Sequence, residues 1–368
     1  MSRHRITVVL SQAQGKHPVK RALEESIVAA LLMEPGLDVS VIPHLYDLGP
    51  DHTGRLFLGS VRGDMVFLSW LFPRAAFWVM DRDGIKGHWG ETQLKPPAED
   101  DDEEAGEPQP AKGIGSLDVP DRHIYCLDLR DFNQHAPYLD EIRRIAQECR
   151  ERHEAKQHDR GQGQPAIVQL GLNLRNGDML PSPPAALPEA EGGQMSAPVP
   201  DGEERLSQAF APEQLLEATG RRWYPVIDYN RCTNCMECID FCLFGVYGVD
   251  GQERLLVENQ DNCKKGCPAC SRVCPEQAIM FPDYKTPAIA GAPIGAIGNL
   301  KIDLSKLFGG ADKDALSQAV EERDRELVAD GRQAVGTTVG LPKRQEHKDA
   351  KPKDDLDNLI DALDALEL

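Results

Sequence analysis

Residues 231–245 read RCTNCMECIDFCLFG, which places four cysteines within eleven positions. The first three are spaced three residues apart, and the fourth follows after a step of four. A second dense group with a similar spacing comes later, and Pro275 directly follows it. In a reducing compartment this density predicts metal or cluster ligation rather than disulfides. The two groups hold eight of the ten cysteines of the chain within 43 residues: Cys232, Cys235, Cys238, Cys242, Cys263, Cys267, Cys270 and Cys274.

A cubane iron–sulfur cluster has four irons at its corners, and each iron needs one thiolate from the protein. A loop with a cysteine at every third position can wrap three corners, so the fourth ligand has to come from elsewhere in the chain. The alternative for eight clustered cysteines is a pair of structural zinc sites, which usually take Cys-x2–4-Cys pairs separated by a longer segment. Two dense groups of four favour iron–sulfur clusters over zinc.

Residues 221–284 resemble a bacterial-type dicluster ferredoxin domain, whose motif is Cys-x2-Cys-x2-Cys-x3-Cys-Pro. The two halves of this segment also resemble each other. VIDYNRCTNCMECIDFCLFGVY aligns cysteine on cysteine with LVENQDNCKKGCPACSRVCPEQAI once one extra residue is allowed. The resemblance implies an α+β, pseudo-twofold ferredoxin-like domain over 220–285 that carries two 4Fe–4S clusters.

In this family the fourth cysteine of each motif serves the other cluster. The resemblance therefore implies that each half of the domain lacks one ligand when it is alone. One cluster is expected on Cys232, Cys235, Cys238 and Cys274. The other cluster is expected on Cys242, Cys263, Cys267 and Cys270.

Two positions depart from the family motif. Leu243 stands where the first motif would have proline, a change that leaves the ligand itself in place. The interval from Cys263 to Cys267 is one residue longer than usual, and Gly266 can absorb the extra residue as a small bulge. Among the eight cysteines, Cys263 has the spacing that departs most from the family.

Residues 1–156 alternate between apolar, strand-like segments and amphipathic helices. Such alternation predicts a parallel sheet covered by helices, that is, a Rossmann-like α/β domain. An insertion at 93–118 contains a run of acids, and we expect it to be disordered. The expected strands are 5–10, 37–45, 64–71 and 123–129, and the expected helices are 17–33, 73–80 and 136–156.

The N-terminal segment has neither the P-loop pattern nor G-x-G-x-x-G. Parallel sheets bind ligands beyond the carboxyl ends of their strands, and Ser11, Lys16 and His17 lie in the first such turn. We expect them to form an ordinary turn and helix start, and we predict no catalytic residue. Packing roles, rather than flavin stacking or metal ligation, are predicted for Trp70, Phe72, Phe77, Trp78, Cys126 and Cys149.

The net charge of −19 is concentrated outside these segments. Residues 99–107 contain seven acids and no base. Residues 157–219 are rich in proline and glycine, which predicts a disordered linker. Residues 286–368 are expected to form an extended C-terminal region with a solvated helix at 313–331 and an acidic amphipathic helix at 354–368. The apolar stripe of that last helix is Leu356, Leu359, Ile360, Leu363 and Leu366.

Together these features predict an electron-transfer protein whose clusters carry electrons to or from a protein redox partner. The helix at 354–368 is expected to dock on that partner or, equally, on its own protein. Nucleic acid is disfavoured as a partner because no basic stripe is present to neutralise phosphates. No apolar run approaches the roughly 20 residues of a membrane span, so a cytoplasmic protein is expected.

Two other functions stay open at this point. In one, the protein is an oxidoreductase or a subunit of one, and its α/β domain binds flavin or another cofactor that the clusters supply with electrons. In the other, the protein is a scaffold whose clusters sense the redox state. A bound flavin would favour the first, and clusters that cannot cycle reversibly would favour the second.

Overall fold

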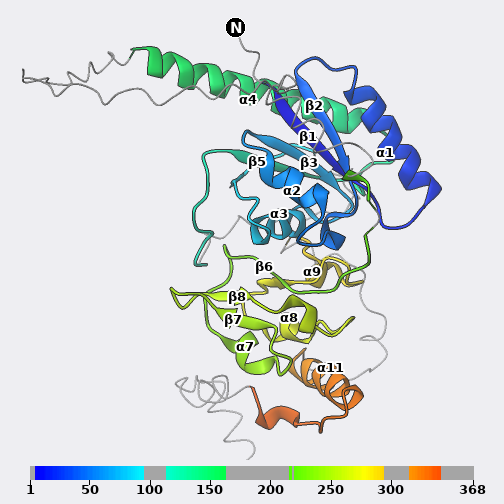
Figure 1. Cartoon of the computed structure of the whole chain (residues 1–368), viewed down its shortest axis with the longest axis vertical. Coiled ribbons are helices and arrows are strands. Elements are labelled where there is room, and N and C mark those ends of the chain that lie inside the picture. Colours follow the sequence, from blue (N-terminus) through cyan, green and yellow to red (C-terminus); the bar gives the residue numbers. More distant parts are fainter. Residues whose placement is uncertain (1–4, 95–112, 163–214, 218, 294–314, 341–368) are drawn as a thin grey trace, which may run out of the picture.

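The computed structural model describes residues 5–94, 113–162, 215–217, 219–293 and 315–340. The N-terminal sheet and its helices occupy one end of the molecule, and the cysteine-rich segment lies beside them (Figure 1). A C-terminal helix lies at the opposite end. The expected linker lies outside the described residues apart from its ends, and the expected helix at 354–368 lies wholly outside them.

A five-stranded sheet forms the centre of the N-terminal domain, and all of its strand pairs are parallel. The inner strands Ile6–Ser11 and Met65–Ser69 are mostly apolar and almost fully buried, as strands covered on both faces usually are. The expected parallel α/β fold is therefore confirmed for this domain. In spatial order the strands are β2 (Leu37–Ile42), β1 (Ile6–Ser11), β3 (Met65–Ser69), β5 (His123–Asp128) and β4 (His88–Trp89).

Helices cover both faces of this sheet (Figure 1). Helices α1 (Pro18–Leu31) and α4 (Ala136–Gln162) pack on one face, where alternate strand residues such as Val8 and Val66 point. Helices α2 (Thr53–Ser60) and α3 (Pro73–Arg82), with the short turn η1 (Leu45–Asp47), pack on the other face. Cys126 and Cys149 are buried in these two cores, as predicted.

Two elements of this domain were not expected from the sequence. Helix α2 has only eight residues and β4 only two, so neither is long enough for its hydrophobic period to show. The second strand was expected to continue to residue 45 but ends at Ile42. Pro43 follows it and has no N–H with which to extend the ladder.

The cysteine-rich segment has two halves with the same order of elements. Each half runs from a strand through a cysteine loop and a short helix into a second strand. The first strand of each half pairs antiparallel with the last strand of the other half. The first half contains β6 (Val226–Ile227), α7 (Glu237–Phe241) and β7 (Tyr247–Val249). The second contains β8 (Leu255–Val257), η2 (Gln260–Asn262), α8 (Ala269–Val273) and β9 (Ile279–Met280).

Helix α3 joins the two domains. One of its sides packs under the sheet. The same hydrophobic cluster also includes Val226 and Met280 from the cysteine-rich segment. The Arg74 guanidinium donates to the Asp228 carboxylate across this boundary at 2.6 Å. Tyr46 and Tyr224 stack with ring centroids 4.3 Å apart, and each hydroxyl donates to the other residue's carbonyl oxygen. Because apolar packing, an ion pair and hydrogen bonds all cross the boundary, the two domains share one continuous interface.

The end of the acidic insertion takes part in the same interface. Residues 113–118 were expected to be disordered with the rest of the insertion. Instead the backbone N–H groups of Gly113, Ile114 and Gly115 donate to carbonyl oxygens of Asn230, Cys232 and Tyr229 respectively. The preceding residues 95–112 lie outside the described part of the chain.

The C-terminal region also folds against the cysteine-rich segment. Helix α9 (Pro287–Ala290) buries Ile289, within the region that was expected to be extended. Helix α11 (Ala315–Ala329) packs against α8, and the turn η4 (Gly336–Thr338) follows it. The expectation of a solvated helix here is wrong, because one face of α11 is buried by this packing.

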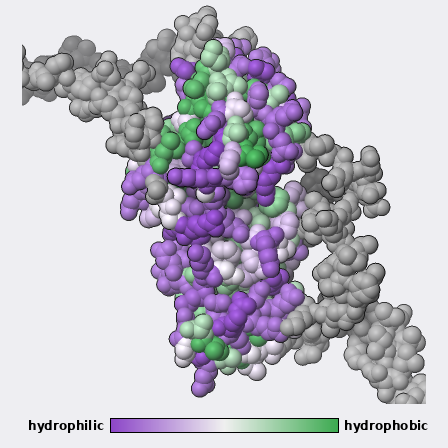
Figure 2. All heavy atoms as spheres, turned by 90° about the vertical axis from the view of Figure 1, so that its right-hand side faces the viewer, coloured by the Kyte–Doolittle hydropathy of each residue, from purple (hydrophilic) through white to green (hydrophobic). Residues whose placement is uncertain are grey.

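The surface is mostly hydrophilic on the face shown in Figure 2, with apolar patches over the N-terminal domain at its top. Within the described ranges, no helix combines the length and the apolar character that crossing a bilayer requires. The strongly apolar residues lie instead between the sheet and its helices and around the cysteines.

Candidate functional site

The first cysteine group surrounds a pocket between the two halves of the cysteine-rich segment. Three of its thiols come from the loop 232–238, and the fourth comes from the residue that ends α8 in the other half. Leu255, Ala278 and Ile279 give the same pocket an apolar wall. The four cysteines that line it are Cys232, Cys235, Cys238 and Cys274.

The backbone of the loop 232–238 is bent so that it can curl around this pocket. Asn234 and Met236 both have positive φ angles, 60° and 65°. The Asn234 side chain holds the bend, since its amide donates to Glu253 O and accepts from the N–H of Leu255. This side chain therefore stabilises a left-handed conformation that asparagine tolerates better than most residues do.

Backbone N–H groups point at sulfur atoms in this group. The N–H of Ala278 lies 3.3 Å from the Cys274 sulfur. Burial raises the pKa of the Cys232 thiol, and the N–H of Asn234 opposes that rise by favouring the thiolate. Burial also raises the pKa of the Cys238 thiol, and the neighbouring thiols of Cys274 and Cys232 raise it further. All four thiols of the group therefore interact, although Cys274 belongs to the other half of the segment.

The second cysteine group is gathered in the same crossed way. Burial raises the pKa of the Cys270 thiol, and the thiols of Cys242 and Cys263 are the next largest causes of the rise. Burial and the thiols of Cys267 and Cys242 likewise raise the pKa of Cys263. Cys242, which follows the first triplet in sequence, thus lies among the cysteines of the second.

The extra residue in the second loop is accommodated as the sequence suggested. Gly266 has a φ of +86°, a conformation that side chains other than glycine rarely adopt. Space is open around its Cα, so backbone strain rather than a clash is what disfavours another residue there. This turn returns the longer loop so that Cys263 lies near Cys267.

Tyr247 lies between the two groups. Its buried hydroxyl donates to the Cys270 sulfur at 3.0 Å, and Cys238 and Cys242 are close enough to help raise its pKa, which burial raises most. One side chain therefore touches the second group and lies close to the first. Tyr247, Ile227, Ile279 and Phe281 share one apolar cluster with several of the cysteines, which keeps water away from the sulfurs.

Trp223 is a site residue that the sequence did not indicate. Its ring stacks on Phe281 with centroids 5.1 Å apart, and it lies beside Cys263, where it opposes the rise that burial causes in the pKa of that thiol. Its buried Nε1 has no hydrogen-bond partner other than this sulfur in the part of the chain that the structure describes. A buried donor beside a sulfur, with no other acceptor, suits a neighbouring group that carries negative charge.

Whether these residues fit an iron–sulfur cluster depends on the donors that they offer. Seven of the eight thiols are partly or fully buried with raised pKa values, so they would keep their protons unless a metal replaced them. The N–H groups and the tyrosine hydroxyl that face the sulfurs are donors of the kind that stabilise bound thiolates. Within the described ranges, no three His, Cys, Asp or Glu side chains are placed so that they could hold a single metal ion. The donor set fits clusters, and the ligation itself stays a prediction.

The carboxyl edge of the N-terminal sheet, where a cofactor was considered, is occupied by the protein's own side chains. The buried Glu24 carboxylate accepts from the N–H of Ala13 at 2.6 Å and from the Trp70 indole at 2.8 Å. Ser11 donates to Pro43 O and accepts from the N–H of Leu45. Lys16 and His17 are exposed beside this edge. These contacts give Ser11 a structural role in the first turn, and a ligand at this edge stays untested.

The four aromatic residues singled out in the sequence also pack against protein. Phe77 and Trp78 are buried in the α3 core, where Trp78 meets Tyr229 edge-on with centroids 5.7 Å apart. The Arg130 guanidinium lies 3.7 Å above the Phe72 ring. These aromatic residues therefore pack in the core and at the interface.

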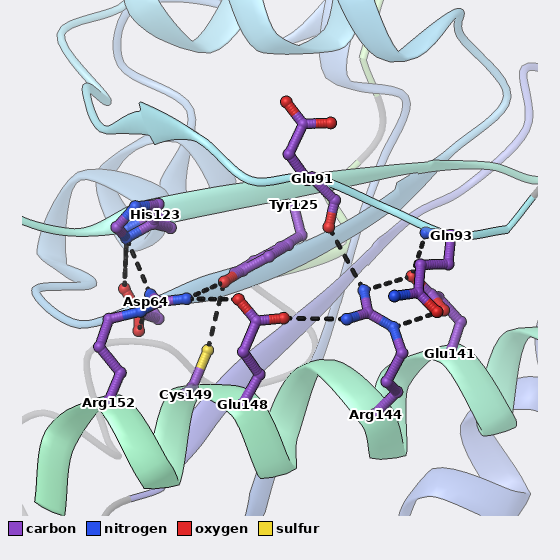
Figure 3. Close-up of polar contacts among 10 residues, drawn as sticks. All are labelled: Asp64, Glu91, Gln93, His123, Tyr125, Glu141, Arg144, Glu148, Cys149 and Arg152. Carbon is purple, nitrogen blue, oxygen red and sulfur yellow. Dashed lines mark hydrogen bonds and ion pairs between the residues drawn. The ribbon is translucent and has the colours of Figure 1, made fainter. Parts of the chain in front are cut away.

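A dense polar network lies at the opposite, amino-terminal edge of the sheet (Figure 3). Arg152 of α4 donates to the Tyr125 hydroxyl at 2.7 Å, to His123 Nδ1 at 2.9 Å and to Glu148 at 2.7 Å. Burial and the Arg152 charge lower the pKa of His123, so its ring stays neutral and can accept that bond. Arg144 pairs with Glu141 one turn earlier on the same helix. The bonds from Arg152 to Tyr125 and His123 bind α4 to β5, so we assign this network a structural role.

Comparison with known proteins supports part of this description. An uncharacterized ferredoxin of Methanocaldococcus jannaschii is 50% identical to this chain over 81 residues, which are 20% of this chain and 54% of that protein. The chain therefore spans about half the length of the curated relative that it matches. No protein-family model and no solved structure matches the chain. The likeness supports a ferredoxin domain in part of the chain and an iron–sulfur, electron-transfer role for it, and it does not identify the N-terminal domain.

Proposed function

We propose that this protein transfers electrons through two 4Fe–4S clusters held within residues 220–285. The observation that carries the proposal is the crossed grouping of the thiols, in which Cys274 lies with the first triplet and Cys242 with the second. Each 4Fe–4S cluster, when bound, accepts and releases one electron. The first would be held by Cys232, Cys235, Cys238 and Cys274, and the second by Cys242, Cys263, Cys267 and Cys270.

The other residues of the site would prepare it for that chemistry. The N–H groups of Asn234 and Ala278 and the Tyr247 hydroxyl point at ligand sulfurs and stabilise their negative charge. Apolar residues such as Ile279 and Phe281 exclude water. Because Tyr247 is close to both groups, the path between them runs through one packed side chain rather than through solvent.

Metal and sulfide analysis tests this proposal. Protein purified without oxygen should contain about eight irons and about eight acid-labile sulfides per chain, since each of two cubanes needs four of each. Reduction should then produce the electron paramagnetic resonance signal of two interacting clusters. Stoichiometric zinc without sulfide would refute the proposal.

We further propose that the redox partner is a protein and that residues 354–368 take part in its docking. The apolar stripe of that segment supports this, because a lone helix of about fifteen residues is marginal in water and gains stability only when its stripe is covered. Its acids favour a partner whose groove has a basic rim.

A further inference from the structure

The C-terminal residues 315–340, which we term the cap, cover the second cysteine group. On α11, Ala319 and Val320 pack in one cluster with Phe241, Cys267 and Val273. The cap thus touches both the helix that precedes Cys242 and the loop that carries Cys267. In Figure 1 α11 lies directly against α8, at the end of the molecule farthest from the sheet.

Polar contacts hold the cap to residues beside the cysteine ligands. Glu322 forms an ion pair with Arg272 at 3.0 Å, and Asp330 forms one with Lys264 at 2.7 Å. The Arg332 guanidinium donates to Leu243 O at 2.8 Å, directly after Cys242. The attachment is therefore distributed over the whole second group rather than made at one point.

Arg323 is the most buried charged residue of the cap. Only 1% of its surface is exposed, and its guanidinium lies 4.5 Å from the centre of the Phe241 ring. It donates to Val339 O and Gly336 O and pairs with Asp324, which offsets part of its charge. Burying a guanidinium costs free energy, so its position next to the residue that precedes Cys242 calls for an explanation.

The field of Arg323 reaches the second cysteine group. Burial raises the pKa of the Cys242 thiol, and the Arg323 charge acts against that rise. Glu322 and Glu326 of the same helix act in the opposite sense on Cys267, where they add to the rise that burial causes in its pKa. In the first group the corresponding cation is Arg254, whose charge favours the Cys232 thiolate.

We propose that the cap tunes the reduction potential of the second cluster, and that Arg323 raises this potential. Reduction adds one electron, and a nearby buried cation stabilises the added negative charge, whereas Glu326 destabilises it. Arg323 acts through the field that it places on the cluster and its ligands, so it is a positioning residue and not a catalytic one. This inference rests on the proposed function, because it requires that the clusters be bound.

The test is a redox titration of the full-length protein, purified without oxygen and followed by electron paramagnetic resonance. Arg323→Met should lower one of the two reduction potentials and leave the other in place, and Arg323→Lys should restore it because the charge is kept. Glu326→Gln should raise the same potential, and Arg254→Met should lower the other one. Arg143→Met is the control, since the Arg143 side chain is 52% exposed on α4 of the other domain and pairs there with Glu34 and Asp140, so its loss should move neither potential.

The possible failures can be told apart. Wild-type protein without iron and sulfide would refute the proposed function. Fully loaded Arg323→Met protein with two unchanged potentials, or with both shifted equally, would refute only the role of the cap. If Arg323→Met loses a cluster, the Glu326→Gln variant decides the question. Among the contacts described, the Glu326 side chain pairs only with the exposed Arg325, so the cap should stay attached in this variant. An unchanged potential in Glu326→Gln would then overturn the inference.

Discussion

Cys242 shows how one residue can belong to a group other than that of its sequence neighbours. After Cys238 the chain continues through α7, and Cys242 ends that helix. Its thiol lies among Cys263, Cys267 and Cys270. In the same way, Cys274 ends α8 and its thiol lies with the first triplet. Each short helix therefore ends at a cysteine whose thiol lies in the other cysteine group.

Replacing Cys242 with alanine should damage the cluster of the second triplet. Loss of one thiolate typically releases one iron, so we expect a three-iron signal in the oxidised protein. Cys242→Ala and Cys267→Ala should give closely similar paramagnetic resonance spectra, because both remove a ligand of one cluster.

Cys274→Ala and Cys235→Ala form the matched pair for the first cluster. If Cys242→Ala instead resembled Cys235→Ala, the assignment of Cys242 would have to be reversed.

Sequence spacing could indicate that the eight cysteines form two groups, because each cysteine loop is local, with thiols three or four positions apart. It could not indicate Trp223 or Arg323. Arg323 lies far beyond the last cysteine in sequence and reaches Phe241 only because α11 folds back onto α8. Contacts between segments so far apart leave no periodic pattern in the chain.

At the scale of elements, the long strands and helices of the N-terminal domain could be predicted, since their apolar residues repeat with a clear period. The packing of helix α11 could not be predicted from such a period. Its buried face consists of Ala319, Val320, Arg323 and Leu327, and an arginine in that stripe hides the amphipathic pattern. The sequence therefore indicated a helix correctly but not that it would be packed.

Arg152 should contribute to the stability of α4, because it binds this helix to β5. Arg152→Met removes donors from the Tyr125 hydroxyl and from His123, and each lost charged hydrogen bond costs about 1.5–3 kcal/mol before compensation by water. We expect the amides of α4 to exchange hydrogen about 5–30 times faster, as a net loss of about 1–2 kcal/mol implies.

Arg150→Met is the control for this measurement. Arg150 is exposed on the same helix, and its guanidinium donates only to the Ala146 carbonyl oxygen among the contacts described. Equal exchange rates in the two variants would show that the network in Figure 3 does not hold α4.

At the scale of the whole molecule, the docking of the two domains could not be predicted, although the α/β class of the N-terminal domain could. The Tyr46–Tyr224 pair and the Arg74–Asp228 ion pair join residues more than 150 positions apart. Nothing in either local stretch marks it as an interface, because tyrosine and arginine occur as readily on free surfaces. Only the tertiary structure shows that α3 packs against both the sheet and the cysteine-rich segment.

Deleting 354–368 tests the proposed docking segment. If the segment docks on a partner, the truncated protein should keep its iron and its melting temperature but bind a protein partner more weakly. If the segment docks on its own chain, the melting temperature should fall instead. A variant with Leu359 and Leu363 replaced by serine should reproduce the effect without shortening the chain, and replacement of Asp357 by asparagine serves as the control that keeps the apolar stripe. Unchanged binding and unchanged melting would contradict both forms of the proposal.

The hydrogen bonds from Gly113, Ile114 and Gly115 to residues 229–232 bear on the order in which this protein matures at the ribosome. The N-terminal sheet can fold early, yet the loop it supports begins with Cys232, and the pocket around that loop closes only after Cys274 has been synthesised. The cap comes later still. The N-terminal sheet is therefore synthesised first, both cysteine loops follow, and the cap comes last, so the second cysteine group is complete but still uncovered for an interval before the cap is made.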